Sequence, residues 1–409
     1  MSPSNTEGDK LSSGPAGQSS GPKDALNEPL LARSEAKYKE TLLELKSAGS
    51  VLRSDLNQPA VTTKPEWFDA TLFESAKAVY SEHFMAINFA HLSGLLLLVR
   101  VDSVFRTLSS TGKSDSVSKL FNRYYQTIIH VKKWYEGDIF DENSEAHRSL
   151  LIVRGMHNQV SRSLNNSKKG SKSNLNESAS SQFNANEGES VDFNDNETIR
   201  NKINQREDEG RPQKGVHISQ YDIMITQFAF VGFIVMHAKS VGLIEKFDEF
   251  ELRSLLHFWR VIGYYLGASD KFNLCSRSLD DIQGLCESIT DCEYRQSIAA
   301  NPISSSPGIM SVNILRSVKF IPMLTIYGML KYLYDLLRID TAELEAKSSR
   351  YSRLSHTLIK LVMTNLLAYK PLRIFNNSLT RLSVYIVGKF QDHFVSHLEN
   401  KYGSDLKAM

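Results

Sequence analysis

The sequence predicts an all-α fold, on the basis of three observations. Apolar residues recur three and four positions apart over long stretches, which is the spacing of one helix face. No stretch alternates strand and helix patterns, and no series of hairpin turns appears. Helix-end signals stand at the borders of these stretches. Ser219 is followed three residues later by Asp222, as in a capping box, and Gly112 directly follows an apolar block.

The helices can be placed in chain order from these patterns. In the first half of the chain, helical stretches are expected at Asp24–Ser47, Asp69–Leu108, Asp115–Trp134 and Ser144–Leu164. An acidic loop, Glu136–Asn143, separates the last two of them. In the second half, helices are expected at Ile218–Gly242, Asp248–Gly267, Asp280–Ser297, Val312–Leu337, Arg353–Leu366 and Leu379–Asn400.

Two stretches lack apolar periodicity and divide the chain. Residues 1–30 are rich in Ser, Gly and Pro and are predicted to be a disordered tail. Residues 165–213 are rich in Asn, Ser, Glu and Asp and are predicted to be a disordered insertion at the surface. Residues 31–164 and 214–409 are then the two parts of one helical domain.

Composition limits the function classes. The 409 residues hold 48 Lys and Arg against 46 Asp and Glu, and this balance argues against a general nucleic-acid binder. Cys275, Cys286 and Cys292 are predicted to be reduced thiols, and no apolar signal core is seen, so an intracellular, cytoplasmic protein is expected. The most apolar runs, Phe89–Val101 and Thr226–Val235, are short for a membrane span and are predicted to be core helices.

One histidine in the fourth predicted helix is the main candidate for chemistry. His157 can offer an imidazole to a haem iron, and Arg154 one turn earlier lies on nearly the same helix face, where it can pair with a propionate. Arg123 and Thr127 are four residues apart on the preceding helix and share a face. They can form the other wall of a haem pocket, supplying a cation and a hydroxyl for bound oxygen or water.

Simpler interpretations remain open for the same residues. A helical histidine is more often a core or surface residue than a ligand, and the arginines 154 and 162 can be solvated or paired with Glu142 and Glu145. His393 and His397, four apart, have zinc-ligand spacing but are expected on an exposed face. No phosphate loop, nucleophile elbow or carboxylate-rich di-iron pattern is present.

Three stretches resemble the rubber oxygenase (latex-clearing protein) family and the related ER-bound oxygenases of mycophenolic acid biosynthesis. The first is Thr111-Gly112 followed by Arg123-x-x-x-Thr127, and the second is Val153-Arg154-x-x-His157-x-x-x-x-Arg162. The third is Gly215-Val216-x-Ile218-Ser219-Gln220-x-Asp222, followed by the run from Phe258 to Gly267. The separation of Arg123 from His157 also fits, and the resemblance covers roughly residues 65 to 290 without the insertion.

The resemblance implies a globin-like multi-helix domain that holds one haem b, with His157 as the axial iron ligand and the Arg123–Thr127 pair close to the haem. Family members that act on rubber cleave carbon–carbon double bonds with dioxygen and give carbonyl products. Gln126 stands where rubber-cleaving members can carry a ligating lysine, and the stretch from Val104 to Thr111 holds no acid to serve as a base.

Three functions follow as alternatives. In the first, a haem-dependent oxygenase acts with dioxygen on an apolar unsaturated molecule such as an isoprenoid or lipid. His157 is then the axial ligand, Thr127 and Gln126 lie near the oxygen, and Arg123 and Arg154 are electrostatic anchors. The second is a non-catalytic haem binder, and the third is a haem-free helical scaffold. Association with the ER or another membrane surface through the amphipathic stretches Val312–Leu337 and Leu379–Leu398 is a further possibility.

Overall fold

The protein is all-helical throughout its described part, as predicted. The computed structural model describes residues 24–56, 58–166, 215–244, 247–300, 303–318, 325–340, 342–346 and 348–403, and no strand occurs among them. The first half holds α1 (Asp24–Gly49), α2 (Ala70–Glu82), α3 (Phe84–Leu98), α4 (Asp102–Ser110), α5 (Val117–Glu136) and α6 (Glu145–Asn166). The second half holds α8 (Gln220–His237), α9 (Glu249–Tyr265), α10 (Leu279–Ile289), α11 (Gln296–Ala300), α12 (Ser306–Ser317), α13 (Ile326–Leu336), α14 (Ala342–Ala346), α15 (Arg350–Thr364), α16 (Lys370–Lys389) and α17 (Gln391–Tyr402). Shorter 3-10 turns are η2 (Ala238–Val241), η3 (Asp270–Phe272), η4 (Leu274–Ser276) and η6 (Leu366–Ala368), and η5 (Thr290–Arg295) is a π-helix.

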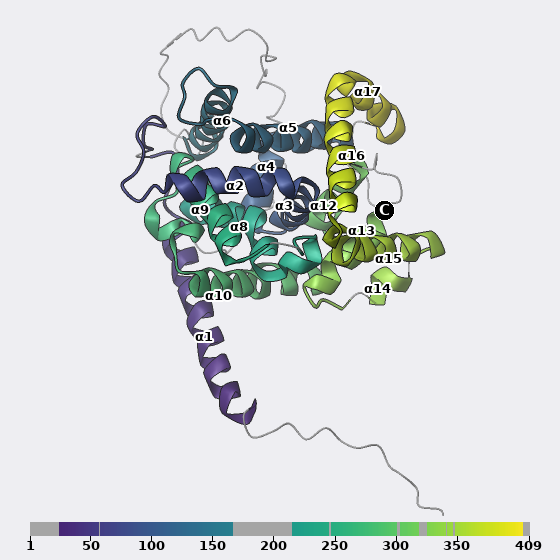
Figure 1. Cartoon of the computed structure of the whole chain (residues 1–409), viewed down its shortest axis with the longest axis horizontal. Helices are drawn as coiled ribbons and strands as arrows, with labels where there is room; N and C mark the ends of the chain where they lie inside the picture. Colours follow the sequence, from purple (N-terminus) through teal and green to yellow (C-terminus); the bar gives the residue numbers. More distant parts are fainter. Residues whose placement is uncertain are drawn as a thin grey trace, which may run out of the picture.

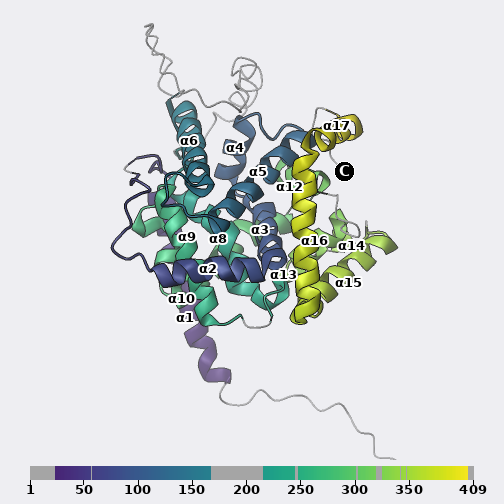
Figure 2. The ribbon, with the colours of Figure 1, turned by 45° about the horizontal axis from the view of Figure 1, so that its top comes forward.

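The helices form a bundle from which α1 extends (Figure 1). The C-terminal part of α1 packs against α10 and α8, while its N-terminal part points away from the bundle in both views (Figures 1 and 2). Helices α5 and α6 lie together at one side, and α16 runs along another side with α15 next to it.

Several predicted boundaries need correction. Residues 24–30 belong to α1 and residues 165–166 end α6, so the predicted tail and insertion are shorter than 1–30 and 165–213. The remainder of both stretches lies outside the described residues. The single block predicted at 69–108 is three helices, because the chain turns at His83 and again at Val99–Val101. The helices predicted at 312–337 and 379–400 are also divided, into α12 and α13 and into α16 and α17.

The predicted helix starts in the second half are confirmed where a side chain caps the helix. Ser219 and Asp222 form a reciprocal capping box at the start of α8, in which each side chain accepts from the other residue's backbone N–H. Asp248 forms the same device with Glu251 at the start of α9. These caps satisfy backbone N–H groups that a helix start leaves without an intrahelical partner.

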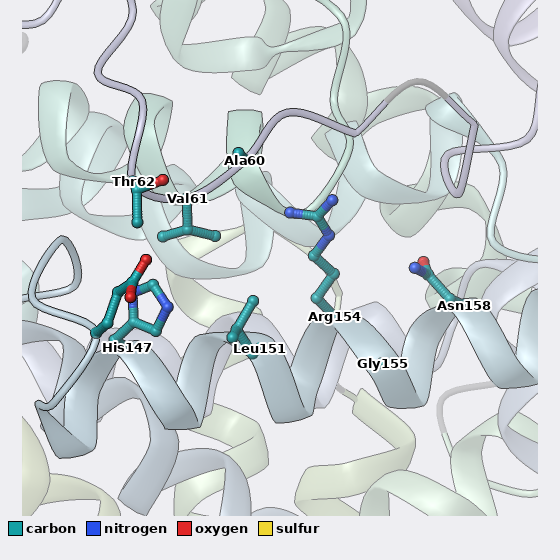
Figure 3. Close-up of a pocket in the computed structure, with 9 residues that line it drawn as sticks. Ala60, Val61, Thr62, His147, Leu151, Arg154, Gly155 and Asn158 are labelled. Atoms are coloured by element: carbon teal, nitrogen blue, oxygen red, sulfur yellow. The ribbon is translucent and has the colours of Figure 1, made fainter. Parts of the chain in front are cut away.

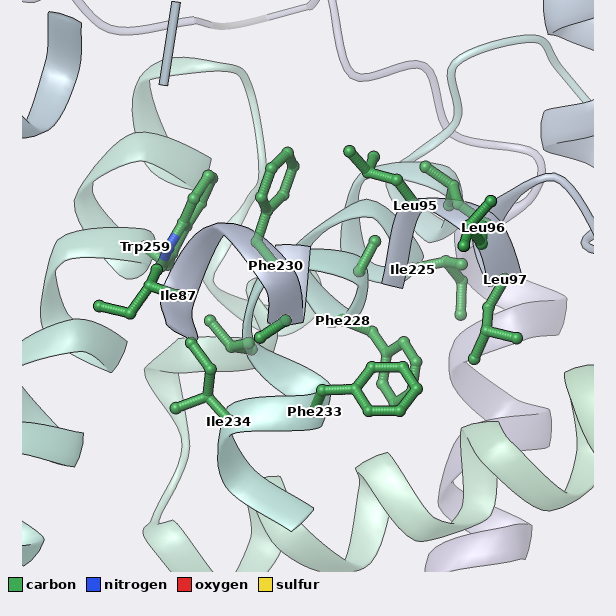
Figure 4. Packing of buried hydrophobic residues seen from close by; sticks show 14 of the residues in the cluster. Ile87, Leu95, Leu96, Leu97, Ile225, Phe228, Phe230, Phe233, Ile234 and Trp259 are labelled. Atoms are coloured by element: carbon green, nitrogen blue, oxygen red, sulfur yellow. The ribbon is translucent and has the colours of Figure 1, made fainter. Parts of the chain in front are cut away.

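Helices α3 and α8 are the centre of the core. They make the most extensive contact between any two helices of the described part, with Gly94 directly against the backbone of Ala229. Nearly every residue of α8 is buried, and Figure 4 shows its apolar side chains packed among those of α3 and α9. Among the described helices, one segment, Gln220–Val241, is by itself long and apolar enough to cross a membrane. Helices α3 and α4 reach that length and apolar character as a pair, but they are bent by 90° where they meet. Burial of α8 in the bundle agrees with its prediction as a core helix.

An aromatic stack joins the other helices to this centre. Tyr135 of α5 lies between Tyr80 and Phe258, with ring centroids 4.0 Å apart on both sides. Its hydroxyl accepts a 2.8 Å hydrogen bond from the indole N–H of Trp259, which itself stacks on Phe230 at 4.1 Å. Aromatic pairs of this kind add to the hydrophobic stabilisation of the core. Cys275 and Cys286 are buried nearby, and all three cysteines are free thiols, as predicted.

His91 of α3 is enclosed by this aromatic cluster and should make stability depend on pH. Burial lowers the pKa of its imidazole to about 3, so the folded protein holds it neutral at a pH where the unfolded chain protonates it. Stability is therefore full above the unfolded pKa of about 6.5 and falls as the pH drops below it. We expect the free energy of unfolding to fall by about 2 kcal/mol from pH 7 to pH 5 through His91 alone.

Urea unfolding at both pH values measures this dependence. His91→Leu should remove about 2 kcal/mol of the difference, while His393→Leu, at an exposed histidine of α17, should leave it unchanged. An unaltered pH dependence in His91→Leu would contradict the assignment.

Candidate functional site

Helices α5 and α6 pair in antiparallel register, and this pairing sets the geometry of the candidate site. Lys133 near the end of α5 binds Glu145 at the start of α6, with 3.0 Å between the ammonium and the carboxylate. One turn further, His130 Nδ1 and Ser149 Oγ are 2.7 Å apart. The register then brings His157, later in α6, opposite Arg123, earlier in α5, and the charge of Arg123 acts on the imidazole. The interface therefore unites the first and second motif stretches.

At this interface, His157 has a buried polar atom for which the packing of the described residues provides no hydrogen-bond partner. Its side chain is half-buried, but the Nδ1 atom is buried and has no hydrogen-bond partner among the described residues. Burial, then the positive charge of Arg123 and then His130, lower the pKa of the imidazole to about 4. His157 is therefore neutral at pH 7, which is the form that binds a metal.

Arg123 holds the chain segment between α4 and α5. Its guanidinium donates to the hydroxyl of Thr111 at 3.1 Å, to the hydroxyl of Ser114 and, at 3.5 Å, to the carbonyl of Leu108. The spacing of Thr111-Gly112 and Arg123 in the first motif thus corresponds to a direct contact, and Gly112 has the positive φ of 64° that a glycine adopts readily. Burial lowers the pKa of Arg123, and no carboxylate of the described residues forms an ion pair with it.

Thr127 and Gln126 are placed differently from each other. Thr127 lies one turn after Arg123 on the same face, and its hydroxyl donates to the Arg123 carbonyl at 3.0 Å within α5. Gln126 is exposed, so the structure does not bring it together with His157. The hydroxyl and the amide therefore do not share one wall of a site in this packing.

Arg154 lies on a different face of α6 from the one that meets α5. Its guanidinium donates to the side-chain oxygen of Gln58 at 2.8 Å and to the carbonyl of Pro59 at 2.6 Å. It lines a surface pocket of about 460 Å³ between α6 and the segment 60–62, where Figure 3 shows it pointing toward that segment. His147 and Glu142 lie in the same pocket, but His157 and Arg123 do not. Arg162 pairs with Asp55 at 3.6 Å, a partner that differs from the Glu142 and Glu145 considered as alternatives.

The third motif stretch joins this corner of the bundle to α8. The side chain of Asn165, at the end of α6, bonds both the N–H and the carbonyl of His217, at 2.8 and 3.0 Å. His217 Nδ1 lies 2.9 Å from the hydroxyl of Thr107 in α4, and Asp222 accepts from Ser103 at 2.6 Å. Ser161 of the second motif stretch also donates to the His217 carbonyl at 3.4 Å, so the second and third stretches are neighbours in space, and α4, which precedes the first stretch, packs against the third.

His130 was not among the predicted site residues, although its position in the sequence indicates the interface. His130 lies three residues after Thr127 and seven after Arg123, which puts it on the face of α5 that meets α6. Burial, followed by the charge of Lys133, lowers its pKa. The α5–α6 interface thus holds two neutral imidazoles and one arginine.

The fit of haem b to these residues is partial. A neutral imidazole with a buried, unpartnered nitrogen suits an axial ligand. His157 lines neither of two surface cavities, of about 460 and 430 Å³, and Val153 packs in the core one turn before it. A porphyrin therefore requires α6 to move away from α5.

No group of three or more metal-ligating side chains occurs within the described ranges, and His393 and His397 lie exposed on α17. Comparison with protein-family models, with curated proteins and with solved structures found no match for this chain.

Proposed function

We propose that this chain is a haem b-dependent oxygenase with a globin-like helical domain, similar to the rubber oxygenases. The observation that carries the proposal is the neutral imidazole of His157, whose Nδ1 is buried without a partner beside Arg123. A buried polar atom without a hydrogen bond costs free energy, and such atoms in a folded protein require an explanation. An iron ligand is one such explanation.

Each candidate residue has a proposed role that follows from the chemistry of its side chain. His157 would hold the iron, and Arg123 and Arg154 would attract the haem propionates once α6 had moved, since both guanidiniums are now bonded only to neutral oxygens. Thr127 would position dioxygen or water, whereas Gln126, expected in the same role from the sequence, lies exposed in this packing. Bound haem supplies the activation of dioxygen. The substrate class that suits a greasy helical pocket is an apolar unsaturated molecule, such as an isoprenoid or a lipid.

A haem-free helical scaffold is the second candidate, and specific contacts favour it. Arg123 and Thr127 already have internal hydrogen-bond partners, and Arg154 is bonded to the segment 58–59. Gln126 faces solvent. A non-catalytic haem binder is the third candidate. It is favoured by two departures from the rubber-cleaving enzymes, because Gln126 stands where they can carry a lysine and Val104–Thr111 lacks an acid.

Dioxygen uptake by the haem-loaded protein tests the oxygenase. We expect uptake with an unsaturated isoprenoid and none with its saturated counterpart, because dioxygen adds across the double bond to give two carbonyl groups. Thr127→Val should slow the uptake while leaving haem content unchanged. Haem-loaded protein that consumes no dioxygen with unsaturated isoprenoids or lipids would instead be a non-catalytic haem binder.

A further inference from the structure

Helix α16 shows an apolar face to solvent. Its outer face carries large apolar side chains at alternating spacings of three and four residues, each between 39% and 63% exposed. They are Leu372, Phe375, Leu379, Leu382 and Ile386, with Phe390 directly after the last residue of the helix, and we call these six residues the α16 stripe. Ile374 and Tyr385, exposed by 54% and 64%, border it. A helix on the surface of a soluble domain normally has the opposite orientation, with its apolar stripe toward the core.

Polar contacts hold α16 in this orientation. Arg373 is buried and pairs with Glu82 at 2.9 Å, and Asn377 bonds the Glu82 carbonyl at 2.7 Å and the Met85 N–H at 2.9 Å. One turn further, Arg381 pairs with Glu136 of α5 at 3.0 Å. The polar face of α16 is thus fixed to α2, α3 and α5, so the stripe must face outward.

The chain segment that carries the stripe is basic. From residue 346 to residue 391 the chain contains no Asp or Glu. Five cations of this region are exposed and form no ion pair with a described residue: Arg350, Arg353, Lys360, Lys370 and Lys389. Helix α15, next to α16 on the same side of the molecule (Figures 1 and 2), adds exposed apolar side chains at Tyr351, Leu354 and Leu361.

An anionic lipid bilayer has the chemistry that complements this face. Apolar side chains enter the boundary between headgroups and acyl chains, while lysine and arginine reach the anionic headgroups with their long stems. A second copy of the chain fits less well, because each copy would bring several cations and no acid from this region to the contact. Charge complementarity therefore selects the bilayer over self-association.

We propose that the α16 stripe and the cations around it bind the surface of an anionic membrane, with α16 lying in the plane of the bilayer. This membrane contact does not depend on haem. It uses a face of the molecule formed by α15 and α16, whereas the candidate haem site lies between α5 and α6.

Vesicle flotation with the full chain tests the proposal. Binding to vesicles of phosphatidylcholine with phosphatidylserine should exceed binding to phosphatidylcholine alone by roughly tenfold and should weaken as salt is added. The triple variant Phe375→Ser, Leu379→Ser, Leu382→Ser should lose roughly tenfold or more of this binding. The double variant Lys360→Glu, Lys389→Glu should lose the preference for phosphatidylserine.

A triple variant at equally exposed positions elsewhere is the matched control. Leu43→Ser, Leu52→Ser, Leu56→Ser removes side chains exposed by 61%, 48% and 57% and should bind as the wild type does. A wild type that ignores both kinds of vesicle, or equal losses in both triple variants, would overturn the proposal. A wild type that sediments as a dimer, binds no vesicles and becomes monomeric through the stripe variant would assign the stripe to self-association instead.

Discussion

Gly94→Ala is expected to destabilise the protein by about 3 kcal/mol, at the upper end of the usual cost of overpacking a core. A Cβ at Gly94 would lie 1.9 Å from the carbonyl oxygen of Ala229, 2.6 Å from its carbonyl carbon and 2.7 Å from its Cα. All three atoms belong to the backbone of α8, so no side chain can turn aside. The two central helices must separate, and the aromatic cluster around His91 and Trp259 separates with them.

Gly155→Ala is the matched control, since it makes the same change in another helix. A Cβ at Gly155 meets nothing within 4 Å. Because alanine favours the helix over glycine, this variant should gain about 0.5–1 kcal/mol. Urea unfolding of both variants measures the difference. Equal stabilities for the two variants would show that α3 and α8 are not in close contact at Gly94.

The helix starts could be predicted where the residues that cap the helix lie close together in the sequence. The capping partners of Ser219 and Asp248 lie three residues away, so the sequence contains the whole device. The divided helices had weaker signals. Apolar periodicity runs through Phe390, and the nearest glycine, Gly388, lies inside α16 rather than after its end. Only Pro322 marked the predicted 312–337 helix for a break. The start of α16 was missed, although Pro371 stands in its first turn, where proline is favoured.

For the candidate site, the sequence could predict which residues share one face of a helix. The four-residue spacing of Arg123 and Thr127 gave a shared face of α5, and the register of α5 and α6 brings that face to His157. Side-chain partners from other segments could not be derived this way. Arg154 turns to Gln58, almost a hundred residues earlier, because a carbonyl and an amide oxygen are offered there.

The orientation of α16 differs most from what its sequence pattern predicts. Its apolar spacing is that of a core-facing helix, and periodicity alone says that one face is apolar without saying where it points. The direction is decided by Glu82 and Glu136, which lie on α2 and α5 and pair with Arg373 and Arg381. Those contacts join residues more than two hundred positions apart.

Replacement of His157, the proposed axial ligand of a haem, should have the largest functional effect. His157→Ala removes the imidazole assigned to the iron, so haem affinity should fall by roughly tenfold or more. Gln159→Ala, at an exposed position of the same helix, is the matched control and should bind haem as the wild type does.

The most direct measurement is the ultraviolet–visible spectrum of the purified wild type and both variants, each mixed with haem b. We predict a Soret band typical of a bound haem in the wild type and in Gln159→Ala. In His157→Ala the band should be lost or strongly shifted, and added imidazole should restore it. A full, unshifted Soret band in His157→Ala would contradict the ligand assignment, and its absence from a well-folded wild type would establish the haem-free scaffold.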